Sequence, residues 1–206
     1  MTVLFPETLL DFTAYFNKVS SIIRKLFIDL FNVTYQKENG KDYMVLPDDK
    51  KFLLSDSASG LQAVVPALLI FEYYAQDEEK KSYTFEEPEL NLFPIAQKKL
   101  VELIVEKVLN NGHKMVMTTH SPYMLTALNN LIYAYQVGQK EPDKVKALIE
   151  QKFWLDPQNV AAYFLEKGII RSLIDEELQS IKAEEIDEAS ELVNSLHSEL
   201  LEIEIQ

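Results

Sequence analysis

Strand-like and helix-like segments alternate through the middle of the chain, and this order restricts the fold more than any other feature. Strands are expected at residues 82–86, 114–119 and 131–137, with helices at residues 94–110 and 121–130 between them. A strand–helix–strand–helix–strand order predicts a mostly parallel sheet with right-handed crossovers. We therefore expect an α/β fold with flanking helices.

The N-terminal part adds a long helix and a hairpin. Apolar residues recur at three- and four-residue spacing from Glu7 to Leu30, which predicts a helix. Residues 32–36 and 42–46 alternate in polarity on either side of Asn39-Gly40, a turn sequence typical of a β-hairpin. Two further elements are expected after it, a strand at residues 51–54 and an apolar helix at residues 61–76.

The C-terminal part turns polar after Gly138. A helix is expected at residues 142–152 and an edge strand at residues 160–166. The tail is expected to form an amphipathic helix, because one apolar stripe runs through its glutamates: Ile186, Ala189, Leu192, Val193, Leu196, Leu200 and Ile203. This stripe is compatible with packing on the sheet or on a partner. We expect residues 1–31 to form a helical arm and residues 32–206 to form one lobe.

Composition excludes several classes of function. The formal net charge of −13 repels nucleic acid and acidic membranes, so any contact with nucleic acid would come through a larger assembly or a local basic patch. The chain has no cysteine, which excludes disulfides, thiolate zinc sites and cysteine nucleophiles. The longest apolar stretch, residues 61–71, is shorter than the roughly 20 residues that cross a bilayer. The first residues of the chain include no basic segment of the kind that opens a secretory signal. We therefore expect a cytoplasmic protein without a membrane partner.

Polar side chains follow two consecutive strands of the expected sheet. Glu86 and Glu87 end the first strand and are followed by Pro88, and His120 comes after the next strand along the chain. Carboxyl ends of parallel strands lie at the edge where open α/β sheets bind ligands. Neighbouring carboxylates on a strand point to opposite faces, so these two cannot flank one bond as a glycosidase pair would. At the carboxyl end of the strand the backbone turns, and both can reach a ligand above the edge of the sheet.

Three segments resemble the ABC-type ATPases, and most closely the SMC/Rad50-like and overcoming-lysogenization-defect (OLD) group. The run Glu86-Glu87-Pro88-Glu89, followed by Leu92 and Pro94, resembles the Walker B segment of these proteins. Residues 118–122, Thr-Thr-His-Ser-Pro, resemble their switch-histidine segment, and residues 57–62 resemble their signature loop. The order and spacing of the three segments match from about residue 32 to the C-terminal helix.

The resemblance implies a role for five residues and two cofactors, ATP and Mg²⁺. Glu86 would hold Mg²⁺, Glu87 would orient or deprotonate the attacking water, and His120 would contact the γ-phosphate. Ser59 and Gly60, with the start of the following helix, would offer backbone N–H groups to a phosphate. In the family that phosphate belongs to ATP on the partner subunit, so the resemblance also implies a dimer.

The phosphate-binding loop of this family is missing. No Gly-x-x-x-x-Gly-Lys-Ser/Thr sequence occurs, and the one Gly-Lys pair, Gly40-Lys41, is followed by Asp42 in the expected hairpin turn. Ala58 stands where signature loops usually carry serine. We therefore expect a partial P-loop NTPase, the C-terminal lobe of an ABC-type ATPase, that acts as a homodimer or with a partner lobe carrying Walker A.

Two other functions stay open at this point. One is a non-catalytic interaction module that derives from an ATPase and has lost the P-loop. The other is a metal-dependent nuclease that uses Glu86, Glu87 and Glu89, which would require a metal cluster drawn from several strands.

Other conspicuous residues are expected to have structural roles. His113 follows a glycine and is expected to be exposed, and Gln97 is expected on a helix surface. Ser121 is expected to cap a helix that has Pro122 at its first position. Trp154 is expected to pack under the edge of the sheet.

Overall fold

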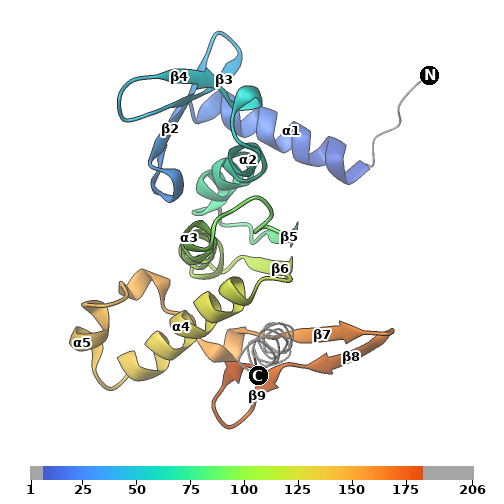
Figure 1. Ribbon diagram of the computed structural model, residues 1–206, viewed down its shortest axis with the longest axis vertical. Helices are drawn as coiled ribbons and strands as arrows, with labels where there is room; N and C mark the ends of the chain where they lie inside the picture. The colour runs from blue at the N-terminus through green and yellow to red at the C-terminus, as the bar shows by residue number, and fades with distance from the viewer. Residues whose placement is uncertain (1–6, 183–206) are drawn as a thin grey trace, which may run out of the picture. The chain divides into compact units, whose positions relative to one another are not determined.

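The computed structural model describes residues 7–182, with side chains from residue 11 onward. The chain divides into two compact units, Met1–Thr118 and Thr119–Gln206. Figure 1 shows the helices and strands of both units in chain order. None of the described helices is long and apolar enough to cross a membrane.

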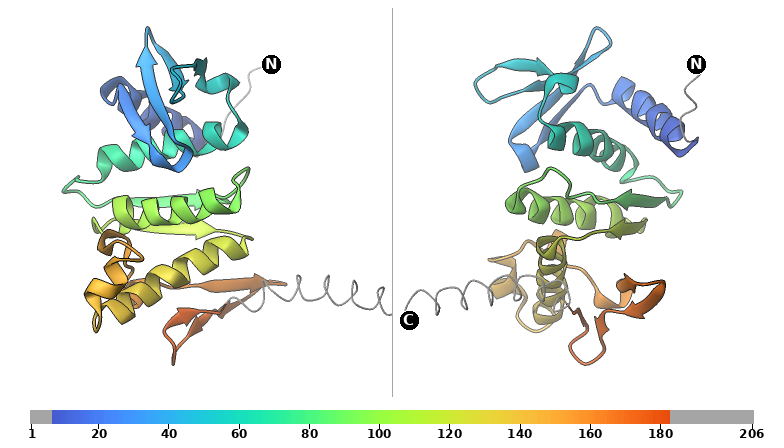
Figure 2. Two further views of the ribbon diagram at one scale, coloured as in Figure 1. Left: turned by 60° about the vertical axis from the view of Figure 1, so that its left-hand side comes forward. Right: turned by 45° about the vertical axis from the view of Figure 1, so that its right-hand side comes forward.

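The first unit contains a four-stranded antiparallel sheet. The strands pair in the order β1 (Lys25–Ile28), β2 (Val33–Glu38), β3 (Lys41–Val45) and β4 (Lys51–Leu53). The predicted hairpin is confirmed, because Asn39 (φ 49°) and Gly40 (φ 75°) both have the left-handed backbone that a tight turn between β2 and β3 requires. Tyr35 and Met44 lie on the buried face of this sheet, which packs against the helices of the unit (Figure 2).

Helix α1 is shorter than predicted, covering Glu7–Ile22 instead of residues 7–30. The sequence after it forms β1, which pairs with β2 in antiparallel register. Apolar spacing alone favoured a continuous helix, but β1 gains a ladder of backbone hydrogen bonds from β2 and buries Ile28. The pairing joins β1 to a strand beyond residue 31, the expected end of the helical arm. The division into an arm and a lobe stays a prediction.

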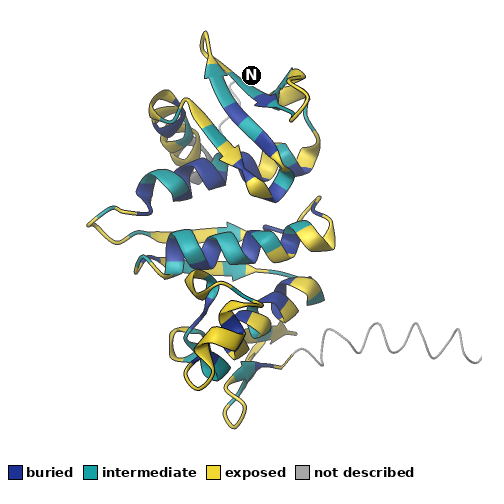
Figure 3. Cartoon of the chain, turned by 90° about the vertical axis from the view of Figure 1, so that its left-hand side faces the viewer, coloured by how far each residue is buried: buried dark blue, intermediate teal, exposed yellow. Residues whose placement is uncertain are grey.

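The first unit also contains a parallel pair of strands. Strands β5 (Ser82–Glu86) and β6 (Lys114–Thr118) pair in parallel register, as predicted. They are connected by α3 (Pro94–Ile104), which continues as a π-helical turn to Leu109. Figure 3 colours the chain by burial, and the buried residues of α3 are Gln97, Leu100, Val101 and Ile104.

The two faces of the β5–β6 pair differ in burial. The half-buried face carries Tyr83, Phe85, Met115 and Met117 and packs on the core. Helix α2 (Ser59–Tyr74) covers this face, and Phe71 places its ring 5.1 Å from that of Tyr83 and 6.3 Å from that of Phe85, measured between centroids. The opposite face is exposed.

The second unit begins with one long helix where a helix and a strand were expected. Helix α4 covers Pro122–Gly138, so the strand predicted at residues 131–137 is wrong. Residues 131–137 contain no glycine or proline, and Leu131, Ile132 and Ala134 are buried along the helix. Without that third strand, the expected mostly parallel sheet is reduced to the β5–β6 pair, and the other strands of residues 7–182 pair antiparallel.

Helix α5 (Pro142–Lys146) is also shorter than its prediction, and the chain then passes through short 3-10 turns. Trp154 packs against Gly138 of α4, and its indole N–H donates to the carbonyl oxygen of Ile149 at 2.9 Å. The prediction that this side chain lies under the edge of the sheet is therefore replaced by packing on α4.

Two small antiparallel pairs complete the second unit. Strand β7 (Tyr163–Glu166) pairs with β8 (Ile169–Ser172), and β9 (Ile174–Asp175) pairs with β10 (Ser180–Ile181). The strand expected at residues 160–166 is thus present, with β8 as its partner. Asn129 of α4 fixes β10 by accepting from the N–H of Ile181 at 2.8 Å and donating to its carbonyl oxygen at 2.7 Å. The amphipathic helix predicted at residues 186–203 lies outside the described residues.

Candidate functional site

The two carboxylates of the expected Walker B segment lie at the carboxyl end of β5. Glu86 is the last residue of the strand, stands opposite Thr118 of β6 and is exposed. Glu87 follows it and is half-buried. The apolar residues of β5 therefore deliver both side chains to the strand end, as the sequence predicts.

The backbone turns sharply at Glu87. Its φ is 46°, in the left-handed region that costs a residue with a Cβ atom about 1–2 kcal/mol. Hydrogen bonds hold this conformation: the N–H of Glu87 donates to Thr118 O at 3.1 Å and to Thr118 Oγ1 at 3.2 Å. The N–H of Leu90 then donates to Glu87 O at 3.0 Å. Because the turn ends the strand alternation, Glu86 and Glu87 are not confined to opposite faces of the sheet.

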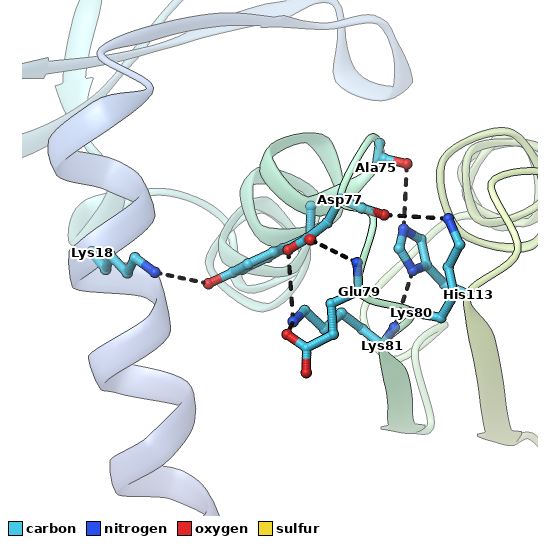
Figure 4. A network of polar contacts seen from close by, with 8 residues as sticks. Lys18, Ala75, Asp77, Glu79, Lys80, Lys81 and His113 are labelled. Atoms are coloured by element: carbon cyan, nitrogen blue, oxygen red, sulfur yellow. Dashed lines mark hydrogen bonds and ion pairs between the residues drawn. The ribbon is translucent and has the colours of Figure 1, made fainter.

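His113 fixes the register of β5 and β6 at their other end (Figure 4). Its side chain is buried, contrary to the prediction that it is exposed. The Nδ1 atom accepts from the backbone N–H of Lys81 at 3.1 Å, and Nε2 lies 3.3 Å from the carbonyl oxygen of Ala75. Since a backbone N–H can only donate, Nδ1 carries no proton here and Nε2–H is the donor.

The lysines beside His113 extend this network. Lys80 Nζ donates to the carbonyl oxygens of Asp77 at 3.3 Å and Asn111 at 3.0 Å. Lys81 Nζ lies 3.6 Å from an Asp77 carboxylate oxygen and also pairs with Glu79. The hydrogen bond to Asn111 connects the loop after α2 to the turn before β6, so the two strands are held at this end as well as at Glu87.

The predicted phosphate-binding residues Ser59 and Gly60 begin α2. Ser59 is exposed and Gly60 is buried against the loop that follows Glu87. A Cβ atom on Gly60 would lie 2.7 Å from the carbonyl oxygen of Asn91, closer than real Cβ atoms approach such an atom. The first unit therefore places the start of the expected signature helix directly against the loop of the expected Walker B segment.

A glutamine side chain organises the loop before α2. Gln62 Nε2 donates to the carbonyl oxygens of Ser55 at 3.1 Å and Ser57 at 2.7 Å. The N–H groups of Leu61 and Gln62 donate to Ala58 O at 2.9 and 3.2 Å. Ala58 thus supplies the first backbone acceptor of the helix, and its side chain makes no cap.

The loop after Glu87 and the first turn of α3 expose large apolar side chains. Leu90, Phe93 and Ile95 are all more than half exposed. Gln97, predicted on a helix surface, is buried instead and donates through Nε2 to Leu92 O at 2.9 Å, which fixes the end of the loop. Exposed apolar side chains grouped in this way are typical of a surface that contacts another protein.

His120 lies in the second unit, two residues after the end of β6, and is exposed. Hydrogen bonds order the residues beside it: Thr119 Oγ1 accepts from the N–H of Ser121 at 3.0 Å. Ser121 Oγ accepts from the N–H groups of Tyr123 at 3.2 Å and Met124 at 3.4 Å. The prediction that Ser121 caps α4, with Pro122 at the first helical position, is confirmed.

Comparison with known protein families identifies the fold. The sequence profile of the AAA ATPase domain matches residues 6–125, more than half of the chain. The chain belongs to the AAA ATPase domain family. The match includes every predicted site residue, from Ser59 to His120.

Similarity to individual proteins is weak. One solved structure, described as "Structural biochemistry of ATP-driven dimerization and DNA stimulated activation of SMC ATPases", aligns with a TM-score of 0.48 and 13% sequence identity. The alignment covers 90% of this chain and 96% of that chain. No curated protein matches the sequence.

The arrangement of acidic residues in this AAA ATPase domain suits a nucleotide-held Mg²⁺ better than a protein-held metal cluster. Among the described residues, no group of three or more histidine, aspartate or glutamate side chains is arranged to hold a metal ion. Glu89 is buried while Glu86 is exposed, so the three-carboxylate cluster that a nuclease requires is not found there. Mg²⁺ in nucleotide sites takes one or two carboxylates together with phosphates and water, and an exposed carboxylate such as Glu86 fits that role.

Sequence reasoning missed the residues that shape the site without taking part in the expected chemistry. Thr118, Gln97 and His113 each hold a backbone group of the AAA ATPase domain through a side-chain atom. The position of Thr118 opposite the end of β5 could be inferred from the predicted parallel pairing. The contacts of Gln97 and His113 involve residues whose proximity depends on the fold.

Proposed function

We propose that this chain is the hydrolysis-side lobe of an ABC-type ATPase of the SMC and OLD kind, completed by a lobe that carries Walker A. The observation that carries the proposal is the turn at Glu87, where a left-handed backbone is held by two hydrogen bonds to Thr118. Strained conformations held by their surroundings are concentrated at functional sites. This turn presents a carboxylate at the strand end where α/β sheets bind ligands.

In this proposal each site residue has one task. Glu87 accepts a hydrogen bond from the attacking water and takes its proton, and His120 donates to the γ-phosphate oxygens as negative charge shifts during bond cleavage. Glu86 would hold Mg²⁺, and the bound cation would supply positive charge to the phosphate groups.

Ser59 and Gly60 act in trans across a dimer in this proposal. The start of α2 offers backbone N–H groups and the positive end of the helix dipole to the γ-phosphate of ATP held by the other subunit. Leu90, Phe93 and Ile95 support this arrangement, since they expose apolar surface on the loop that contacts Gly60 and on the first turn of α3. Any contact with nucleic acid would be made by the complete assembly, because the chain carries a net charge of −13. The absence of cysteine fits the proposed cytoplasmic location.

A non-catalytic interaction module is the second candidate, because the sequence lacks a P-loop while the loop after Glu87 is apolar and exposed. In that case the loop would bind a partner and the carboxylates would have no chemical role. The two candidates differ in their response to substitution at Glu87.

The test is to co-express the chain with a lobe that carries Walker A and to measure ATP hydrolysis by the purified complex. We expect hydrolysis that falls about 100-fold or more in Glu87→Gln, the range of general-base catalysis. Glu79→Gln, in an exposed loop of the same unit, is the matched control and should hydrolyse ATP like the unmodified chain. A complex that forms but shows equal hydrolysis with Glu87 and with Gln would favour the interaction module.

A further inference from the structure

Strand β5 pairs with a described strand along one edge only. Its partner there is β6, in parallel register (Figure 1). At one end of the pair, the N–H of Lys114 donates to Lys81 O at 2.9 Å. At the other end, the N–H of Glu87 donates to Thr118 O at 3.1 Å. The odd-numbered residues of this segment therefore direct their backbone groups towards β6.

The opposite edge of β5 presents the backbone N–H and C=O groups of Ser82 and Thr84. Alternate residues of a strand bond to the same neighbour, and the residues between them point the other way. A row of such groups is a template for one more strand. Two strands are the fewest that a sheet contains, and parallel sheets are usually larger and covered on both faces. The β5–β6 pair therefore has the character of part of a larger sheet.

A groove of about 270 Å³ lies along this edge, within the first unit. Five consecutive residues, 81–85, line it, whereas no residue of β6 does. Because these five residues include side chains from both faces of the strand, the groove is at the edge of β5 that faces away from β6. Phe12 and Tyr15 of α1 and Ala63 and Ala67 of α2 line it as well.

The chemistry of this groove suits an extended peptide. The backbone groups of Ser82 and Thr84 are spaced about 6.7 Å apart, which is the two-residue repeat of a strand. Phe12 and Tyr15 are 41% and 51% exposed, so the helices offer apolar surface beside these groups. A strand added to an edge gains affinity from backbone hydrogen bonds and specificity from pockets for alternate side chains. A compact small molecule would satisfy only part of the row of backbone groups.

We propose that the groove accepts an extended segment of the lobe that carries Walker A, which adds to the free edge of β5 as a third strand. This inference rests on the proposed function, which requires such a lobe. The added segment would bond to the backbone of Ser82 and Thr84. Its alternate side chains would be apolar and would pack against Phe12 and Tyr15 of α1 and the alanines of α2.

Hydrogen exchange tests the inference on the full chain, alone and co-purified with a lobe that carries Walker A. In the chain alone, the amides of Ser82 and Thr84 should exchange at least about 10-fold faster than those of Tyr83 and Phe85, which bond to β6. In the complex, the amides of Ser82 and Thr84 should slow at least about 10-fold. A complex that hydrolyses ATP while these two amides exchange as in the chain alone would overturn the inference and leave the proposed function standing. Slowed amides in a complex without hydrolysis would support strand addition and contradict the proposed function, and absence of any complex would overturn both.

The affinity of the chain for that lobe gives a second readout. Thr84→Pro removes an N–H that points away from β6, so it should weaken binding at least about 10-fold, whereas Thr84→Val keeps the N–H and should bind like the unmodified chain. Ala63→Trp fills the groove from an exposed position of α2 and should also weaken binding at least about 10-fold. Ala14→Trp, at an exposed position of α1 that does not line the groove, is its matched control. Equal affinity of each variant and its control would overturn the inference.

Discussion

Replacing Gly60 with alanine tests whether the start of α2 and the loop after Glu87 pack as one unit. The new Cβ atom would lie 2.7 Å from Asn91 O and 3.0 Å from a methyl group of Leu92. The first of these is a backbone atom in a loop held by the hydrogen bond from Leu92 N–H to Glu89 O at 2.9 Å. The carbonyl cannot rotate away as a flexible side chain would, so the loop or the helix must shift.

Two opposing effects determine the size of the change. Alanine is favoured over glycine inside a helix by about 1 kcal/mol, and less near its first turn. Overpacking a close contact costs about 1–3 kcal/mol. With a clash of this size against backbone, we expect the second effect to exceed the first and Gly60→Ala to lower the free energy of unfolding by about 1 kcal/mol.

Urea unfolding followed by circular dichroism measures this change. For a slope of about 2 kcal/mol per M, the midpoint should fall by about 0.5 M. Ser59→Ala is the matched control, because Ser59 is the exposed neighbour at the start of the same helix and its midpoint should stay within error. A midpoint for Gly60→Ala equal to or above that of the unmodified chain would refute the packing argument.

Substitutions at three further residues test other parts of the structure. Gly138→Ala places a Cβ atom 2.3 Å from the ring of Trp154, the one tryptophan of the chain. We expect the free energy of unfolding to fall by about 2 kcal/mol and the tryptophan emission to shift to the red. Unchanged emission would contradict the contact. Tyr83→Phe removes a buried hydroxyl with no hydrogen-bond partner among the described residues and should raise the free energy of unfolding by about 1 kcal/mol in urea titrations at neutral pH. Burial raises the pKa of Tyr83 from 10.0 to about 12, so above pH 10 this group ionises more readily in the unfolded chain than in the folded one. The free energy of unfolding of the unmodified chain should therefore fall as the pH rises from 10 towards 12, and the advantage of Tyr83→Phe should grow over that range. A constant difference would contradict the burial argument. His113→Ala leaves the N–H of Lys81 without its acceptor and should lower the free energy of unfolding by about 2 kcal/mol, whereas His113→Asn, which keeps an acceptor near Nδ1, should lose less; equal losses would show that the acceptor is unimportant.

Much of the candidate site could be predicted from the sequence. The strand that ends at Glu86, the capping of α4 by Ser121 and the hairpin turn at Asn39-Gly40 are signalled by residues next to one another in the chain. Turn and cap preferences come from local backbone geometry and short hydrogen bonds, so they are readable without knowledge of the fold. The family resemblance rests on the same local segments.

The contacts that shape the site could not be predicted in the same way. Burial of His113 depends on Ala75 and Lys81 lying beside it, and the need for glycine at residue 60 depends on the carbonyl of Asn91. In each case the partner is distant in the sequence. Nothing in the flanking residues indicates which backbone groups will need a partner once the elements are packed.

The sequence by itself determined the strand ends, the caps and the placement of two carboxylates at the end of β5. The tertiary structure decided the state of the apolar segments that suit more than one element. Residues 25–28 became a strand because β2 offers them a hydrogen-bonded neighbour, and residues 131–137 continued α4 because the helix buries their apolar side chains. Periodicity describes which side chains can share a face, whereas the free energy of burial and pairing depends on the surface that the rest of the chain provides.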